Sequence, residues 1–125
     1  MADLLQDFES YFKSKNVNIP IFRDTMPDSP DSVIALYEYQ GSRDFLQIDG
    51  ATRPVQIVVR DKSATAAKVL ARQLYSLLKT DDSILYLTSE RWTTMYLKEP
   101  PFKLKADDKD RIYYCFNVIT TTYED

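Results

Sequence analysis

The strongest folding signal in this chain is an amphipathic pattern at residues 63–79. Its apolar side chains recur at helical spacing and form one broad stripe: Ala67, Leu70, Ala71, Leu74, Leu77 and Leu78. The opposite side carries Lys68, Arg72, Ser76 and Lys79. Such a stripe predicts a helix that buries one side against another layer. Its alanines allow a close approach to that layer, and Asp61 or Ser63 is placed to cap the first turn.

Strand-like segments lie in two groups around this helix. The first group is 19–23, 32–39 and 53–60, and the second is 84–88, 91–98 and 111–120, with a brief strand at 102–104. A second amphipathic helix is predicted at residues 3–15, with Asp3 as its N-cap and Gln6 placed for a capping box. Because the strands cluster instead of alternating with helices, the order α-β-β-β-α-β-β-β predicts the α+β class.

The predicted architecture is a single domain, residues 1–125. Two helices pack on one face of a mostly antiparallel sheet of about five to six strands. We expect the helix at 63–79 to cross over the sheet after the strand at 53–60. Pro20 cannot donate to a strand ladder, so the segment at 19–23 is predicted at a sheet edge or at the beginning of a strand.

The segment 40–52 is a long predicted connection that holds both glycines of the chain, Gly41 and Gly50. It also carries three sizeable apolar groups: Phe45, Leu46 and Ile48. Two interpretations stay open. The segment is an irregular hairpin that folds back on the core, or it is a projecting loop that becomes ordered against a partner.

The residue types present exclude several kinds of chemistry. The chain has no histidine and one cysteine, Cys115. Nucleophile pairs built on histidine are therefore excluded, and so are the usual zinc and iron–sulfur sites. Two glycines cannot make a glycine-rich phosphate loop. Cys115 lies in a strand-like run, so we expect a buried structural thiol. The sequence predicts no catalytic residue, no metal and no cofactor.

Acidic residues cluster at three places, which are Asp24, Asp28 and Asp31, then Asp81 and Asp82, then 107–110. The turn at 107–110 lacks the spacing of a calcium loop, so we interpret it as solvated, and Asp81 and Asp82 as a helix exit. Asp24, Asp28 and Asp31 lie in a proline-rich loop, where linear spacing does not test for a catalytic carboxylate pair. An enzyme that used carboxylates alone would need a pocket with convergent acids of raised pKa. Arg53 and Arg91 each stand at a strand start, where an arginine clamps a carboxylate, stacks on a ring or forms an ordinary surface ion pair.

The net charge and the tyrosine content bear on possible partners. The net charge is −3 and basic residues form no block, so we expect no general nucleic-acid binding. No segment is apolar enough to span a membrane, and the first residues do not resemble a standard export signal. Tyrosine is common at protein interfaces, so some of the nine tyrosines are expected on a contact surface.

Three segments, taken together, resemble a phage family. They are residues 49–60, the helix from Ala64 to Leu78, and the run from Leu87 to Asn117, which contains Pro101, Phe102, Leu104, Asp107 and Arg111. Over roughly residues 4–123 the chain is similar to the small minor capsid proteins of tailed bacteriophages and prophages of Gram-positive bacteria. These look like tail terminators, also called head–tail joining or tail-completion proteins. One departure is Lys105, where a glycine would be expected ahead of the acidic turn.

The resemblance implies a structural α+β subunit that forms a ring, expected to be a hexamer, at the head–tail junction of the virion. The ring would end the tail tube and join it to the head connector or stopper protein, and DNA would pass through its lumen without specific binding. Assembly would take place in the host cytoplasm, with no membrane partner. The candidate assembly interface is Gly41, Phe45, Leu46, Ile48, Gly50 and Arg53. The alternative is a small non-catalytic binding module, such as an immunity or adaptor protein.

Overall fold

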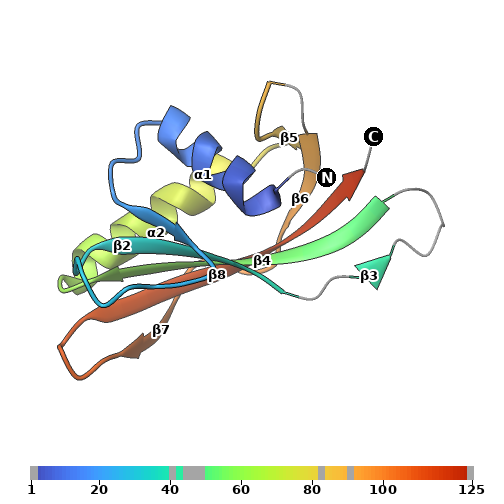
Figure 1. Cartoon of the computed structure of the whole chain (residues 1–125). Helices are drawn as coiled ribbons and strands as arrows, with labels where there is room; N and C mark the ends of the chain where they lie inside the picture. Colours follow the sequence, from blue (N-terminus) through green and yellow to red (C-terminus); the bar gives the residue numbers. More distant parts are fainter. Residues whose placement is uncertain (1–2, 40–41, 44–49, 82–83, 90–91, 124–125) are drawn as a thin grey trace.

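The computed structural model describes residues 3–39, 42–43, 50–81, 84–89 and 92–123 (Figure 1). The helices are α1 (Leu4–Ser14) and α2 (Ala64–Leu78). The strands are β1 (Ile21–Arg23), β2 (Val33–Glu38), β3 (Ser42–Arg43), β4 (Gly50–Asp61), β5 (Ile84–Tyr86), β6 (Trp92–Leu97), β7 (Phe102–Ala106) and β8 (Ile112–Tyr123). Within these residues both helices pack on one face of a single sheet, which confirms the predicted α+β class.

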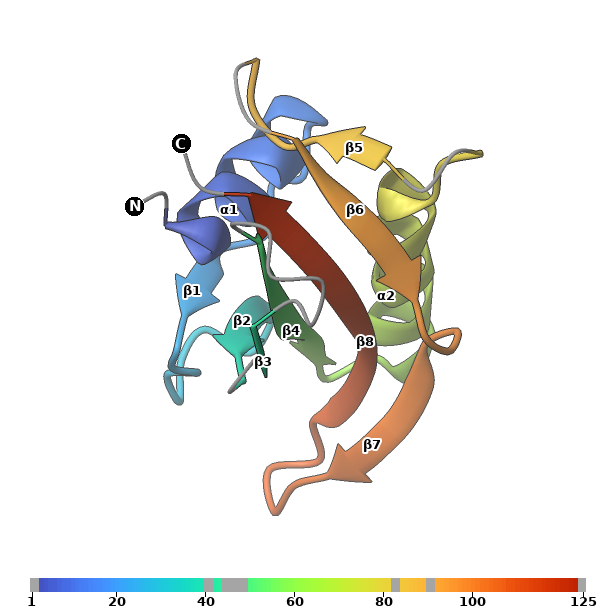
Figure 2. The same ribbon diagram turned by 90° about the vertical axis from the view of Figure 1, so that its right-hand side faces the viewer.

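The sheet is built on one long antiparallel pair. β4 and β8 pair along all 12 residues of each strand, from Gly50 opposite Tyr123 to Asp61 opposite Ile112. Shorter strands complete the sheet in the order β1-β2-β4-β8-β6-β5, with β3 also paired to β4 and β7 to β8. β1 is parallel to β2, and the other described pairs are antiparallel. Figure 2 shows β7 and β6 following one another along the same side of β8.

The core lies between the helices and the sheet. The predicted helical stripes are buried in it, α1 with Leu4, Leu5, Phe8, Tyr11 and Phe12, and α2 with Ala67, Ala71, Leu74 and Leu78. Alternate residues of the central strands meet them, among them Val55, Ile57, Val59, Phe116 and Val118. α2 leaves β4, packs against β8 and β6, and leads to β5 at the far edge, so the predicted crossover is confirmed.

Both helices begin at predicted caps. The carboxylate of Asp3 accepts a hydrogen bond from the backbone N–H of Gln6 at 3.2 Å. The hydroxyl of Ser63 accepts one from the backbone N–H of Ala66 at 3.1 Å. Asp61, the other predicted cap of α2, instead accepts a hydrogen bond from the N–H of Ser63 at 2.9 Å. Each bond satisfies a backbone donor that a helix start leaves unpaired.

The two central strands, β4 and β8, are longer than the sequence predicts. β4 begins at Gly50 and β8 ends at Tyr123, and these added residues pair with each other. Pro54 therefore lies inside β4. Its carbonyl accepts a hydrogen bond from the N–H of Tyr39 at 3.0 Å, on the side of β2. Since the N–H and C=O of a strand residue point the same way, the missing N–H of Pro54 does not cost the β4–β8 ladder a bond.

The sheet edges carry two further features. β1 is an edge strand that begins one residue after Pro20, as predicted. β7 is exposed at all five residues, and its register with β8 shifts between Lys103 and Lys105, which leaves Leu104 as a bulge. Lys105 is a paired strand residue, and the left-handed φ of 61° in the turn that follows belongs to Asp110. The turn therefore needs no glycine at position 105, because aspartate tolerates this conformation.

The α2 stripe predicts a sharp difference between two substitutions on one helix. Leu74→Ala, at a fully buried position, should lower the free energy of unfolding by about 2–5 kcal/mol because it removes core contacts and leaves a cavity. Val69→Ala, at a residue that is 61% exposed, should change it by about 0.5 kcal/mol or less. Urea unfolding followed by circular dichroism measures both, and equal effects would contradict the burial of this stripe.

Candidate functional site

The candidate functional site is the sheet face away from the helices, which we call the open face. Side chains alternate along a strand, so residues between the buried core positions of β4 point to this face, among them Pro54 and Gln56. Residues opposite one another on neighbouring strands share a face. Ile119 of β8 is opposite Pro54, and Tyr96 of β6 is opposite Ile119, so this row crosses three strands of the open face.

Large apolar side chains gather on the open face. Of the eight that are exposed in the described part of the chain, six belong to it, namely Tyr39, Ile84, Tyr86, Trp92, Tyr96 and Phe102. Tyr86 is 58% exposed and Tyr96 is 61% exposed. We call the group on β5 and β6 the aromatic patch, which consists of Ile84, Tyr86, Trp92 and Tyr96. Tyr86 lies opposite Trp92 in the strand register, so the patch is continuous across both strands.

Charged side chains are scarce on the open face. Among the described strand residues that point to it, the charged ones are Arg60 and Lys105, and none is a carboxylate. Both cations lie over the ring of Tyr113, 5.9 and 4.8 Å from its centroid. Glu99 reaches the face from the β6–β7 connection and accepts a hydrogen bond from Asn117 at 2.8 Å. Aromatic side chains with few charges are typical of the buried centre of a protein interface.

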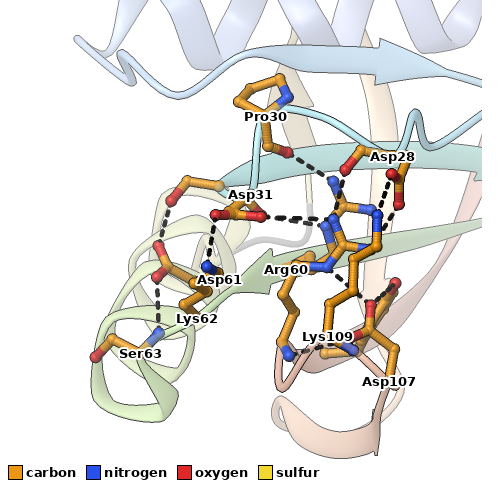
Figure 3. Close-up of polar contacts among 12 residues, drawn as sticks. Asp28, Pro30, Asp31, Arg60, Asp61, Lys62, Ser63, Asp107 and Lys109 are labelled. Carbon is orange, nitrogen blue, oxygen red and sulfur yellow. Dashed lines mark hydrogen bonds and ion pairs between the residues drawn. The ribbon is translucent and has the colours of Figure 1, made fainter.

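One end of the open face is covered by the β1–β2 connection, residues 24–32. Arg60 of β4, which is only 2% exposed, lies between the sheet and this connection and holds it in place (Figure 3). Its Nη2 donates to the carbonyl oxygen of Pro30 at 2.6 Å and its Nε donates to that of Asp31 at 3.1 Å. Val33, Ala35, Val58 and Cys115 of the same end are buried. The open face therefore has a covered end and, at β5 and β6, an exposed end.

Arg111, which is 4% exposed, fixes the same connection to the β7–β8 turn. Its Nε donates to the carboxylate of Asp107 at 2.9 Å, and its Nη2 donates to that of Asp28 at 3.0 Å. Its Nη1 lies 3.6 Å from the carboxylate of Asp31. Asp28 also accepts a hydrogen bond from Lys109. Each buried cation thus faces carboxylate or carbonyl oxygens, as a buried charge requires.

Asp107 is the centre of the turn. Its carboxylate accepts hydrogen bonds at 2.9–3.0 Å from the backbone N–H groups of Lys109 and Arg111, from the Arg111 guanidinium and from the Tyr113 hydroxyl. Burial raises the pKa of this carboxyl, but the hydrogen bonds from Arg111, Tyr113 and Lys109 lower it by a larger amount. The pKa therefore lies well below its usual range. Asp107 is therefore an ionised carboxylate with a structural role, and its oxygens accept four hydrogen bonds from its own chain.

Two carboxylates of the acidic clusters, Asp28 and Asp107, lack the raised pKa that carboxylate catalysis would need. The pKa of Asp28 is lowered by hydrogen bonds from Lys109 and Arg111, and that of Asp107 is lowered too, whereas a catalytic acid holds its proton through a raised pKa. In the described ranges no group of three or more histidine, cysteine, aspartate or glutamate side chains is placed to hold a metal ion. Burial, with a contribution from Glu99, raises the pKa of the Cys115 thiol, which matches the predicted structural thiol.

The structure places only part of the predicted assembly interface. Gly41, Phe45, Leu46 and Ile48 lie outside the described residues. Gly50 is the first residue of β4, and the described part of the segment 40–52 contains an antiparallel pairing of β3 with β4.

Arg53, the last residue of that interface, lies on the helix side of β4 and clamps a carboxylate of its own chain. Its Nε and Nη2 donate to the two carboxylate oxygens of Glu38 at 2.8 and 2.9 Å. Arg53 lies inside β4 and not at its start, and it forms an ion pair within its own chain. Arg91 lies outside the described residues.

The aromatic patch was missed as a site by sequence reasoning. The alternation of Trp92, Thr94 and Tyr96 with Thr93, Met95 and Leu97 was visible, and so was the surplus of tyrosine. Alternation separates the two faces of a strand, but it does not say which face the helices cover, because aromatic rings suit a core as well as an interface.

These features define a class of protein: a small α+β domain whose most distinctive surface is a nearly uncharged aromatic sheet face, suited to contact with other protein. The helices within the described residues are too short or too polar to span a membrane. The chain matches the family model described as bacteriophage tail terminator protein over residues 3–124, so it belongs to this family. It is a structural phage protein of tail completion, and the resemblance in the sequence is confirmed. A comparison with curated proteins finds no match.

The hydrogen bonds to Asp107 predict a specific pH dependence of stability. Because the folded-state pKa lies below the ordinary value of 3.8, this carboxylate stabilises the fold above about pH 4 and loses that effect as the pH falls toward its folded-state pKa. Asp107→Asn should therefore lower Tm at pH 7, and the difference from the unsubstituted protein should shrink by pH 3.

Thermal unfolding at pH 7, 5 and 3 measures this difference. Asp108→Asn, at the neighbouring exposed carboxylate of the same turn, is the matched control and should keep the pH dependence of the unsubstituted protein. A constant Tm difference for Asp107→Asn across the three values would show that the Asp107 carboxylate is not a stabilising anion.

Proposed function

We propose that this chain forms a ring, a hexamer, at the junction of head and tail in the phage particle. The ring ends the tail tube and joins it to the connector or stopper protein of the head. The observation that carries this proposal is the match to the tail terminator family over nearly the whole chain. The partners are other copies of the chain, the tube protein and the head connector, and assembly takes place in the host cytoplasm.

The chemistry of the chain supports a part that works by shape and contact. A ring closes through a heterologous interface, in which one surface of a subunit meets a different surface of the next. The open face offers a surface of interface composition. A net charge of −3 suits a lumen through which DNA passes, because a strongly basic lining would hold the phosphates.

The segment 40–52 stays part of the proposal as a contributor to assembly. Its described portions, β3 and the beginning of β4, lie at the end of the sheet away from α2 (Figure 1). At this end of the sheet the segment meets the next copy, on a side that the helices do not occupy. The Arg53–Glu38 ion pair holds the base of this segment, since Arg53 is in β4 and Glu38 is the last residue of β2.

Removal of the gene from its phage tests the proposed function. Without the ring, tails should have abnormal lengths and should fail to join heads, because nothing ends the tube or meets the connector. Electron microscopy of lysates measures tail length and the fraction of joined particles, and the gene supplied from a plasmid should restore both. Normal, joined tails without the protein would sink the proposal, whereas one-to-one capture of a soluble partner would favour an adaptor or immunity role.

A further inference from the structure

We propose that the aromatic patch is the surface through which one subunit packs against a second copy of this chain. This inference rests on the proposed ring and names the face that closes it. The occupant is a different surface of the next copy, because a face packed on itself about a two-fold axis would stop at a dimer. The patch consists of Ile84, Tyr86, Trp92 and Tyr96, at the exposed end of the open face.

The size of the patch fits the centre of such a contact. A whole aromatic side chain buries about 150–250 Å², so the three rings, which are roughly half exposed, leave about 100 Å² each. With the smaller contribution of Ile84, the patch presents roughly 350 Å². A stable interface of standard size buries about 800 Å² on each partner. The patch therefore supplies about half of one side, and the polar Thr121 of the neighbouring β8, paired in register with Thr94, suits the surrounding rim.

The chemistry of the patch favours a permanent protein contact. Obligate interfaces are more apolar than transient ones. The outer side of α1 carries Glu9 and Lys13 as an ion pair at 2.7 Å, and that of α2 carries Lys68 and Arg72, so docking there would desolvate charges. DNA would need cations to meet its phosphates, and the patch supplies none. The open face thus differs from the helix faces in the property that subunit packing requires.

The covered end of the open face limits where a neighbour can sit. Arg60 and Arg111 hold the β1–β2 connection over that end through short bonds to Pro30 and Asp28. A copy that docks on the open face therefore meets β5 and β6 and not the end near Arg60. The same connection keeps the buried residues Val58 and Cys115 out of the contact.

Site-specific photocross-linking tests this placement in phage particles that carry the chain. A benzophenone amino acid at position 96 should cross-link to a second copy, and mass spectrometry should map its partner peptide. The same probe at position 69 is the matched control, because Val69 on the outer side of α2 is also 61% exposed. It should give few or no cross-links between copies.

The outcomes separate this inference from the proposed function. Particles that contain the chain but give cross-links from position 96 only to another virion protein, or between copies only from position 69, overturn the inference and leave the ring standing. Particles that lack the chain overturn both.

A pair of substitutions gives an independent readout. Tyr96→Glu places a charge in the patch and should reduce the yield of joined particles roughly tenfold or more, as loss of a central interface residue does. Val69→Glu, at equal exposure, should leave the yield close to that of the unsubstituted protein. Both variants should unfold at about the unsubstituted Tm. A folded Tyr96→Glu variant with full yield would contradict the proposal.

Discussion

The pairing of β4 with β8 is the constraint on which the rest of this structure depends. Twelve consecutive residue pairs join two segments that are far apart in the sequence and give the sheet its long axis. Every other described strand attaches to this pair, directly or through one neighbour. Because α2 begins soon after β4 and must reach β5 beyond β8 and β6, it has to cross one face of the sheet, and α1 covers the remainder of that face. The helices do not cover the other face, which is the open face.

One end of the open face is covered by the β1–β2 connection, which Arg60 and Arg111 hold in place, and the other end carries exposed aromatic rings. Desolvation of buried charges costs about as much as their attraction gains, so the bonds around Arg60 and Arg111 act mainly by fixing one position of the β1–β2 connection. That position buries the small and apolar residues nearby, Val33 and Ala35 among them. Rings such as Tyr96, at the other end of this face, stay exposed. The single sheet thus has one half that its own chain covers and one half whose aromatic side chains stay exposed.

Local patterns predicted much of this fold because they record which side of an element is buried. The stripes that include Phe8 and Leu74 predicted both helices, and Pro20 predicted an edge. The local pattern did not predict the extensions of β4 and β8. Gly50 belongs to a strand because it pairs with Tyr123, which lies far away in the sequence.

The candidate site was harder to predict for a related reason. Aromatic alternation on β6 fits a core and an interface equally well, and only the position of α2 decides between them. The ion network around Arg111 likewise joins residues from opposite ends of the chain, Asp28 and Asp107, so no spacing rule could have assembled it.

The bulge at Leu104 bears on whether other chains can add to the sheet at the edge of β7. An exposed edge strand is a template on which further chains can add as strands, and this ends in aggregates without limit. In β7 the register shift interrupts the row of free backbone groups, and Lys103 and Lys105 place charge along it. Strand addition at this edge is therefore disfavoured while the aromatic face stays available. Association through this edge would add strands without limit, whereas a side-chain surface such as the aromatic patch admits a contact of one defined geometry.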